Sequence, residues 1–178
     1  MRVGVAGYGL SGEVFHCPLI EATPGMEVAV VVTSNEERSS KAAARYPGAE
    51  VVPDIADAWN GIDLLVVASP NRSHAELALG AVERDLPVVI DKPLAATLDE
   101  AERVNRAGGR VTVFQNRRWD GDFMTLRSIL DEGSLGQIVR FESRFERFRQ
   151  EIRDAWRESG DPLDGGGQLA DLGAHLID

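Results

Sequence analysis

The sequence is poor in the residues that form covalent and metal-bound frameworks. It has one cysteine, Cys17, among 178 residues, which excludes an internal disulfide and any site with several cysteine ligands. Its three histidines are widely spaced, so a histidine-rich metal cluster is not expected. Its apolar runs fall well short of the roughly 20 residues needed to cross a bilayer. We therefore predict no metal site and no membrane contact.

Positive charge is also scarce, with 19 Lys and Arg residues against 29 Asp and Glu residues and a formal net charge of −10. This average charge repels a phosphate backbone, so nucleic acid is not an expected partner. Hydrophobic residues make up 43% of the chain and charged residues 27%, a mixture typical of globular rather than disordered proteins. The opening MRVGVAGYG lacks the features of a secretory signal peptide, and we expect a soluble cytoplasmic protein.

Apolar runs of strand length recur through the first two thirds of the chain without polar alternation. Such runs are typical of strands buried on both faces, as in a parallel sheet. Helix-like amphipathic stretches separate them, and this order predicts a doubly wound α/β fold of the Rossmann type. The predicted strands cover residues 2–6, 28–32, 64–68, 88–90 and 111–114, and the predicted helices cover residues 12–20, 35–45, 73–84 and 98–107.

Three of the predicted helices open with a hydroxyl residue followed three positions later by glutamate. In such a capping box, the hydroxyl and the carboxylate satisfy backbone N–H groups that have no partner within the helix. The pattern therefore supports the predicted helix starts. The three pairs are Ser34/Glu37, Ser73/Glu76 and Thr97/Glu100.

The pattern changes after about residue 115. Residues 120–131 predict an amphipathic helix that ends before a glycine. Residues 138–148 alternate apolar side chains with arginine and glutamate, which predicts a half-exposed strand of an antiparallel sheet. Because one strand cannot form a sheet, we expect the start of an α+β second domain whose remainder is missing or comes from another chain. The expected division is a dinucleotide-binding Rossmann domain at residues 1–118 and the beginning of the second domain at residues 119–178.

A glycine-rich segment, Gly7-Tyr8-Gly9-Leu10-Ser11-Gly12, joins the first predicted strand to the first predicted helix. In this GxGxxG spacing the first glycine permits a tight turn, and the second lets a pyrophosphate approach the backbone. The third glycine lets the helix pack closely, with its N–H groups facing the phosphates. A glycine turn without a ligand is the alternative, but the strands that follow favour dinucleotide binding.

The residues after the second predicted strand bear on the choice between NAD and NADP. An NAD site usually has an acidic side chain there, which accepts hydrogen bonds from the adenosine ribose. Thr33 and Ser34 instead leave room for a 2′-phosphate, and Arg38 can pair with it. Glu36 and Glu37 would repel a phosphate unless the helix turns them outward, and Ser34 also suits a helix cap. We favour NADP on charge and size, and NAD stays open.

Four polar segments fall beyond the carboxyl ends of the predicted strands, where this fold places a reacting nicotinamide. Lys92 lies between a buried strand and a proline, a stiff support from which its ammonium can polarise a hydroxyl or carbonyl oxygen. A surface lysine at a turn is the alternative interpretation of Lys92. The segments are Ser69-Pro70-Asn71, Asp91-Lys92-Pro93, Gln115-Asn116-Arg117-Arg118-Trp119 and the C-terminal stretch from Asp171 to His175.

Together GYGLSG, SPNRSH, DKPLA and GGGQLADLGAHLID resemble the motif series of the Gfo/Idh/MocA oxidoreductases, the family of glucose–fructose oxidoreductase and inositol dehydrogenase. The resemblance covers the whole chain, with the motifs in family order. It implies NAD(P)-dependent oxidation or reduction of sugars, polyols and related compounds, and a second, open-sheet domain on which oligomers are commonly built. The family's E-K-P lysine falls on Lys92, preceded here by Asp91, and its D-x-x-x-H pair falls on Asp171 and His175.

On this resemblance, His175 is the base that takes a hydroxyl proton, because the ordinary pKa of histidine, about 6.5, lies close to neutral pH. Asp171, on the same helical face, binds the substrate or orients the imidazole. Lys92 holds the substrate oxygen and stabilises the developing alkoxide charge. Without the resemblance, an ordinary i,i+4 helix pair is the favoured interpretation of Asp171 and His175, and a functional pair is the alternative.

Several residues have both a functional and a structural interpretation. His74 lies near the nicotinamide edge but also in the first turn of a helix, and Arg118 and Trp119 can touch nicotinamide or pack between domains. His16 and Cys17 are interpreted as packing residues. The residues expected to contact the cofactor are Gly7, Tyr8, Gly9, Leu10, Ser11, Gly12, Thr33, Ser34, Arg38, Ser69, Pro70, Asn71, His74, Asp91, Lys92, Arg118 and Trp119.

Two functions stay open on the sequence. The leading hypothesis is an NAD(P)-dependent oxidoreductase that transfers a hydride between nicotinamide and a hydroxyl or carbonyl group of a sugar, polyol or related small molecule. The alternative is a non-catalytic NAD(P)-binding module or regulator, which the truncated second domain and the acidic composition favour. The family resemblance leads us to expect a homo-oligomer in the full-length form.

Overall fold

A computed structural model of the chain describes residues 1–146, 148, 150–151 and 159–178. It contains a six-stranded parallel sheet with the strand order β3-β2-β1-β4-β5-β6. The order reverses beside β1, and open α/β sheets bind ligands outside the carboxyl ends of the strands at such a point. The strands are β1 (Arg2–Ala6), β2 (Glu27–Val32), β3 (Glu50–Val52), β4 (Leu64–Val67), β5 (Val88–Asp91) and β6 (Val111–Phe114).

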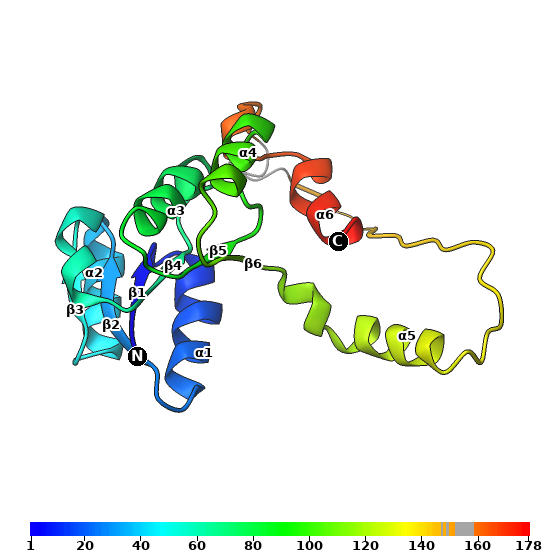
Figure 1. The fold of residues 1–178 in the computed structure, drawn as a ribbon, viewed down its shortest axis with the longest axis horizontal. Helices are drawn as coiled ribbons and strands as arrows, with labels where there is room; N and C mark the ends of the chain where they lie inside the picture. The colour runs from blue at the N-terminus through cyan, green and yellow to red at the C-terminus, as the bar shows by residue number, and fades with distance from the viewer. Residues whose placement is uncertain (147, 149, 152–158) are drawn as a thin grey trace.

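Helices cover both faces of this sheet, residues 121–146 extend away from it, and the C-terminal helix lies back near it (Figure 1). On one face Ala78 of α3 and Val104 of α4 pack in one core with Leu65 of β4. On the other face Cys17 of α1 and Ala42 of α2 share a second core with the strands. The α-helices are α1 (Cys17–Ala22), α2 (Glu36–Arg45), α3 (His74–Val82), α4 (Leu98–Ala107), α5 (Gly121–Asp131) and α6 (Gln168–Leu176). Short helical turns are η1 (Gly12–His16), η2 (Ile55–Asp57), η3 (Trp59–Gly61), η4 (Asn71–Ser73), η5 (Asn116–Trp119) and η7 (Pro162–Asp164).

The fold predicted from the sequence is confirmed, and its five strands agree with the structure to within one residue at each end. The first predicted helix is made of two pieces, the π-helical turn η1 followed by α1. The pattern does not predict β3, because an edge strand of three residues, one of them charged, has too little apolar periodicity.

The three expected capping boxes have different outcomes. The Thr97 box is confirmed: the Thr97 hydroxyl accepts from the Glu100 N–H at 3.3 Å, and the Glu100 carboxylate accepts from the Thr97 N–H at 3.1 Å. The Ser34 box is wrong, because Asn35 caps α2 and accepts an N–H three residues later at 2.9 Å. The Ser73 box is also wrong: η4 leads into α3, and the Ser73 hydroxyl donates to a carbonyl of that turn.

The second region agrees with the sequence only in part. The helix expected over residues 120–131 is confirmed as α5. The strand expected over residues 138–148 is wrong, because the described residues of this segment form no strand. Val139 is 95% exposed and Phe148 is 90% exposed. A strand requires a neighbouring backbone, and the described part of the chain places none beside this segment.

Among the described residues, no helix combines the length and the apolar character required to span a bilayer.

Candidate functional site

The glycine turn lies between the end of β1 and η1, at the carboxyl edge of the sheet. Gly7 has a φ of +106°, and a Cβ added there would stand 2.5 Å from the backbone oxygen of Ala68. Only glycine therefore fits at this position, for conformation and for space. A Cβ on Gly12 would collide with the backbone oxygen of Gly7. These are the tight turn and the close helix approach that the GxGxxG spacing predicts.

The second glycine of the motif faces Arg38 across an open space. A Cβ built on Gly9 would stand 3.8 Å from Nη1 of Arg38, and no closer contact is recorded for it. Because glycine has no side chain, the space beside the Arg38 guanidinium stays open. A negatively charged phosphate group suits such a space. Glu37, the expected source of repulsion, forms an ion pair of 2.8 Å with Lys41 along α2. A lysine partner offsets the negative charge of Glu37 near this space.

Asp91 connects the glycine turn to the end of β5. Its Oδ2 accepts a hydrogen bond from the Ser11 hydroxyl, and its Oδ1 accepts one from the backbone N–H of Lys92 at 2.8 Å. Burial acts to raise the pKa of Asp91, but His16, 3.9 Å away, and the hydrogen bond from Ser11 outweigh it and lower that pKa. The ionised carboxylate thus holds two predicted cofactor-binding segments together. His16 itself is buried against Phe114, with 4.7 Å between the ring centroids.

Lys92 and Asp171 meet although 79 residues separate them. The Lys92 ammonium donates to Oδ1 of Asp171 at 2.6 Å and to the backbone oxygen of Asp171 at 3.0 Å. Their side chains are 14% and 18% exposed, so water screens this ion pair little. Strand β5 and the following Lys92–Pro93 turn, whose peptide bond is cis, supply the lysine, and α6 supplies the carboxylate. The structure therefore brings together two of the three residues expected to be catalytic.

His175 lies one turn after Asp171 on α6. Burial lowers its pKa below 6.5, the nearby cations Lys92 and Arg117 lower it further, and Asp171 and Asp120 oppose them. A lowered pKa keeps the imidazole neutral at pH 7, which is the form that can accept a proton. Its Nδ1 is buried and has no hydrogen-bond partner among the described residues. Unsatisfied buried nitrogens are uncommon and occur at catalytic and ligand sites.

Arg117 and Asp120 belong to this cluster, although the sequence interpretation did not select them. Nη1 of Arg117 lies 2.9 Å from Oδ2 of Asp120, and its guanidinium stacks over the Phe145 ring at 4.8 Å from the centroid. The two expected neighbours are placed differently: Arg118 pairs with the carboxylate of Asp178 at 2.5 and 2.6 Å, and Trp119 is 73% exposed. The 3₁₀ turn η5 sends successive side chains in different directions, and the sequence NRRW does not reveal which arginine faces the cluster.

The loop after β4 contacts the segment that precedes α6. Nδ2 of Asn71 donates to the backbone oxygen of Asp164 at 2.7 Å. Arg72 pairs with the carboxylates of Asp161 and Asp164, the former at 3.2 Å. Within the loop, the hydroxyls of Ser69 and Ser73 lie 2.6 Å apart. This loop, expected at the nicotinamide edge, is therefore held against the segment that leads to Asp171 and His175.

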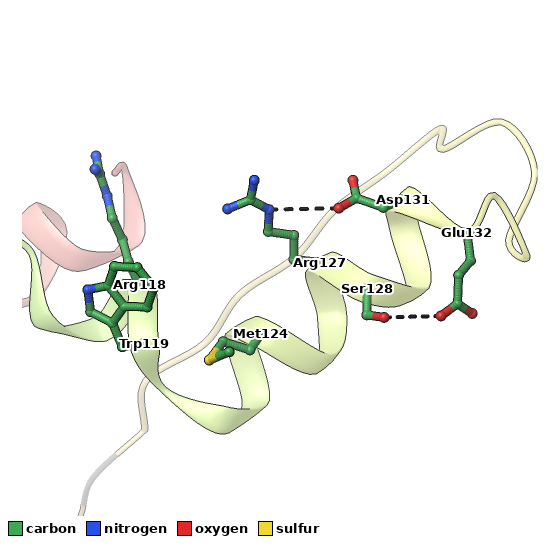
Figure 2. Close-up of a pocket in the computed structure, with 7 residues that line it drawn as sticks. All are labelled: Arg118, Trp119, Met124, Arg127, Ser128, Asp131 and Glu132. Carbon is green, nitrogen blue, oxygen red and sulfur yellow. Dashed lines mark hydrogen bonds and ion pairs between the residues drawn. The ribbon is translucent and has the colours of Figure 1, made fainter.

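A separate surface hollow of about 490 Å³ runs along α5. Figure 2 shows its lining: Arg118 and Trp119 at one end, then Met124, and the pairs Arg127–Asp131 and Ser128–Glu132 along the helix. None of the three expected catalytic residues lines it. In the described part of the chain, His, Cys, Asp and Glu side chains form no group of three suited to a metal ion.

Two family models match the chain. The model of the oxidoreductase family with an NAD-binding Rossmann fold covers residues 1–113, and the model of the GFO/IDH/MocA C-terminal domain covers residues 123–178. The chain belongs to the Gfo/Idh/MocA family of oxidoreductases. This membership confirms the resemblance found in the sequence motifs.

Individual relatives agree with this membership. The uncharacterized oxidoreductase YdgJ of Escherichia coli strain K12 is 46% identical over all of this chain and 52% of its own length. The NADP(+) scyllo-inositol 2-dehydrogenase IolW of Bacillus subtilis strain 168 is 36% identical over all of this chain and 50% of its own length. The solved structure of the B. subtilis protein yvaA, 36% identical, covers 99% of this chain and 51% of its own chain with a TM-score of 0.89. The present chain thus spans about half the length of the relatives that it matches.

Proposed function

We propose that the whole protein is an NADP-dependent oxidoreductase that transfers a hydride between nicotinamide and a hydroxyl-bearing or carbonyl carbon of a polyol, sugar or related small molecule. The carrying observation is the cluster of Lys92, Asp171 and His175, beyond the carboxyl end of β5. The glycine turn lies at the same edge of the sheet. In this fold, cofactor and substrate bind at that edge.

The residues of the cluster divide the chemistry between them. His175 takes the hydroxyl proton during oxidation, because its lowered pKa leaves the imidazole neutral. The Lys92 ammonium stabilises the oxygen as negative charge develops on it, and Asp171 holds that ammonium in place at 2.6 Å. A nicotinamide cofactor held at the glycine turn would supply the hydride acceptor for oxidation and the hydride donor for reduction. The protein's part is to fix the distance and the angle between the reacting groups.

The proposed preference for NADP rests on the residues around Gly9. Arg38 stands over the space that glycine leaves open, and Thr33 and Ser34 leave room beside it for a 2′-phosphate. The relative IolW has NADP(+) in its name, which agrees with this preference. The proposed cofactor contacts are the glycine turn, Thr33, Ser34 and Arg38 at the adenosine end, and the loops containing Ser69 and Asp91 at the nicotinamide end.

The substrate class follows from the chemistry of the cluster and from the names of relatives. An ammonium and a neutral imidazole suit a substrate that offers hydroxyl groups, and several relatives are named inositol dehydrogenases. A polyol is therefore the first substrate class to test. The proposed role of the residues does not depend on which polyol it is.

Spectrophotometry tests this proposal. The whole protein is mixed with NADP+ and a panel of inositols, sugars and linear polyols, and reduced nicotinamide is followed by absorbance. We expect Lys92→Ala and His175→Ala to abolish turnover while calorimetry shows that NADP+ still binds. Arg106→Ala, an exposed position on α4 that pairs with Glu102, is the matched control and should keep turnover. Turnover retained in both cluster variants would contradict the proposed roles. Nucleotide binding without turnover on any substrate would favour the non-catalytic module instead.

A further inference from the structure

His74, the first residue of α3, is buried and uses both nitrogens of its ring. It is 1% exposed. Its Nδ1 lies 2.7 Å from the backbone oxygen of Pro93, and its Nε2 lies 2.9 Å from the backbone oxygen of Ser69. The side chain is thus enclosed by protein and is committed to two backbone partners.

The two partners belong to two different loops of the proposed site. Ser69 follows β4 and begins the loop that contacts the segment before α6. Pro93 follows Lys92 directly, so its carbonyl lies one residue beyond the lysine backbone. His74 therefore spans the gap between the loop after β4 and the turn that carries the Lys92 ammonium.

Lys92 is consequently held at both ends. At its tip, Asp171 accepts from the ammonium at 2.6 Å. At its backbone, Asp91 accepts from the Lys92 N–H at 2.8 Å, and His74 contacts the next carbonyl along the chain. We propose that His74 is a positioning residue that fixes the Lys92 turn for the reaction. The inference rests on the proposed function, since it assigns a role within that same site.

Because the two contacts use different ring nitrogens, substitutions of His74 can test each contact by itself. Both partners are carbonyl oxygens, which only accept hydrogen bonds, and an imidazole with one N–H can donate to one of them at a time. An asparagine amide reaches about as far as Nδ1 and can donate toward Pro93. A glutamine amide reaches about as far as Nε2 and can donate toward Ser69. Glutamine is closer to histidine in volume, so a purely space-filling role for His74 favours His74→Gln over His74→Asn.

The first test compares these two variants with His74→Leu in the whole protein. Because the Pro93 contact fixes Lys92, we expect His74→Asn to keep most of kcat, while His74→Gln and His74→Leu lose up to about a hundredfold. In His74→Gln and His74→Leu, the loss in kcat should exceed any rise in the KM for the dinucleotide. His74→Gln retaining more activity than His74→Asn would overturn the proposal, and this comparison stands even if the leucine variant does not fold.

The second test does not use activity. The 178 residues contain two lysines, Lys41 and Lys92, and Lys41 is 51% exposed on α2. We follow acetic anhydride labelling of each lysine by peptide mass spectrometry, with Lys41 as the internal reference. The Lys92 to Lys41 labelling ratio should rise several-fold in His74→Gln and His74→Leu and stay near the wild-type ratio in His74→Asn. Ser73→Ala, which removes a hydroxyl of the same loop without touching Pro93, is the matched control and should leave the ratio unchanged.

The two readouts separate failure of this inference from failure of the proposed function. A labelling ratio that changes as expected in a protein without turnover would support the positioning of Lys92 and contradict the oxidoreductase reaction. The opposite result is a protein that turns over substrate, but in which neither the Lys92 to Lys41 labelling ratio nor kcat changes in any His74 variant. That result would support the reaction and overturn the positioning role.

Discussion

The sheet strands and residues 138–146 contain similar apolar side chains but bury them very differently. Leu65 and Ile90 have no exposed surface, whereas Val139 is 95% exposed and Phe148, just beyond that segment, is 90% exposed. Strands β4 and β5 each lie between two hydrogen-bonded neighbours, and the described residues place no strand beside 138–146. An alternating pattern thus indicates that one face of a segment is suited to burial. A strand forms only where another backbone also pairs with that segment.

The C-terminal residues 159–178 give a second contrast. They join the Rossmann region through polar contacts rather than through an apolar core: Asn71 donates to Asp164, and Lys92 pairs with Asp171. The proposed site is therefore assembled at a polar contact between two regions, whereas the sheet is stabilised by burial.

The largest expected effect comes from truncating the core. Ile90→Ala in the 178-residue chain should lower the free energy of unfolding by about 2–5 kcal/mol, because the buried side chain leaves a cavity. Val139→Ala is the matched exposed change and should stay within about 0.5 kcal/mol of wild type. Denaturant unfolding followed by circular dichroism measures both. A loss at Val139 equal to that at Ile90 would mean that Val139 is covered in solution, and the contrast between the two regions would disappear.

A smaller effect is expected at the adenosine end of the glycine turn. Arg38→Gln removes the guanidinium beside Gly9, and a hydrogen bond to a charged group is worth about 1.5–3 kcal/mol. We expect NADP+ affinity to fall roughly ten- to a hundredfold, with NAD+ affinity unchanged, as measured by calorimetry. Arg45→Gln, at the far end of α2 and paired with Glu21, is the control and should leave both affinities as they are. An equal loss for both nucleotides would remove the case for a 2′-phosphate site.

A shift of the pH profile is expected when the cation near His175 is removed. Burial lowers the pKa of His175 below 6.5 and Arg117 contributes to the shift, so the acid limb of kcat/KM for alcohol oxidation should lie below pH 6.5. Arg117→Gln removes a positive charge near His175, so protonation of the imidazole becomes less unfavourable. The pKa of His175 therefore rises, and the acid limb moves to higher pH. Arg118 is not among the groups that shift this pKa, so Arg118→Gln should leave the limb in place. Identical pH profiles for both variants would exclude an electrostatic role for Arg117.

The sequence predicts the parts of this molecule in which neighbouring residues determine the outcome. The buried strands, the capping box at Thr97 and the tight turn at Gly7 each depend on a few consecutive residues, and all are observed. Strand β3 is missed because it is short and lies at an edge. The expected cap at Ser34 is wrong because Asn35, next in sequence, has an equally suitable side chain.

The contacts within the site depend on the three-dimensional arrangement and could not be predicted in the same way. The ion pair of Lys92 with Asp171 joins residues that only the folded chain brings together; the residue pattern placed both beyond the strand ends, and the family resemblance suggested their roles, but neither predicted the pair. His74 spans two loops through backbone oxygens, which leave no trace in a sequence. Arg117 and Arg118 are adjacent and chemically identical, so only the orientation of a 3₁₀ turn separates their roles.

The smallest expected effect concerns the contact between the two regions themselves. Arg72 pairs with Asp164, and this hydrogen bond, with one from Ser159, lowers the pKa of Asp164. Salt screens a solvent-accessible ion pair. We therefore expect about 1 M salt to weaken the attachment of this segment as Arg72→Gln does. Both should speed amide hydrogen exchange in residues 161–165 and leave the amides of β1 and β4 unchanged. Since Asn71 still donates to Asp164, the segment should loosen without separating. Faster exchange in the sheet as well would mean that the polar contact stabilises the Rossmann core, and the distinction between burial in one region and polar attachment of the other would fail.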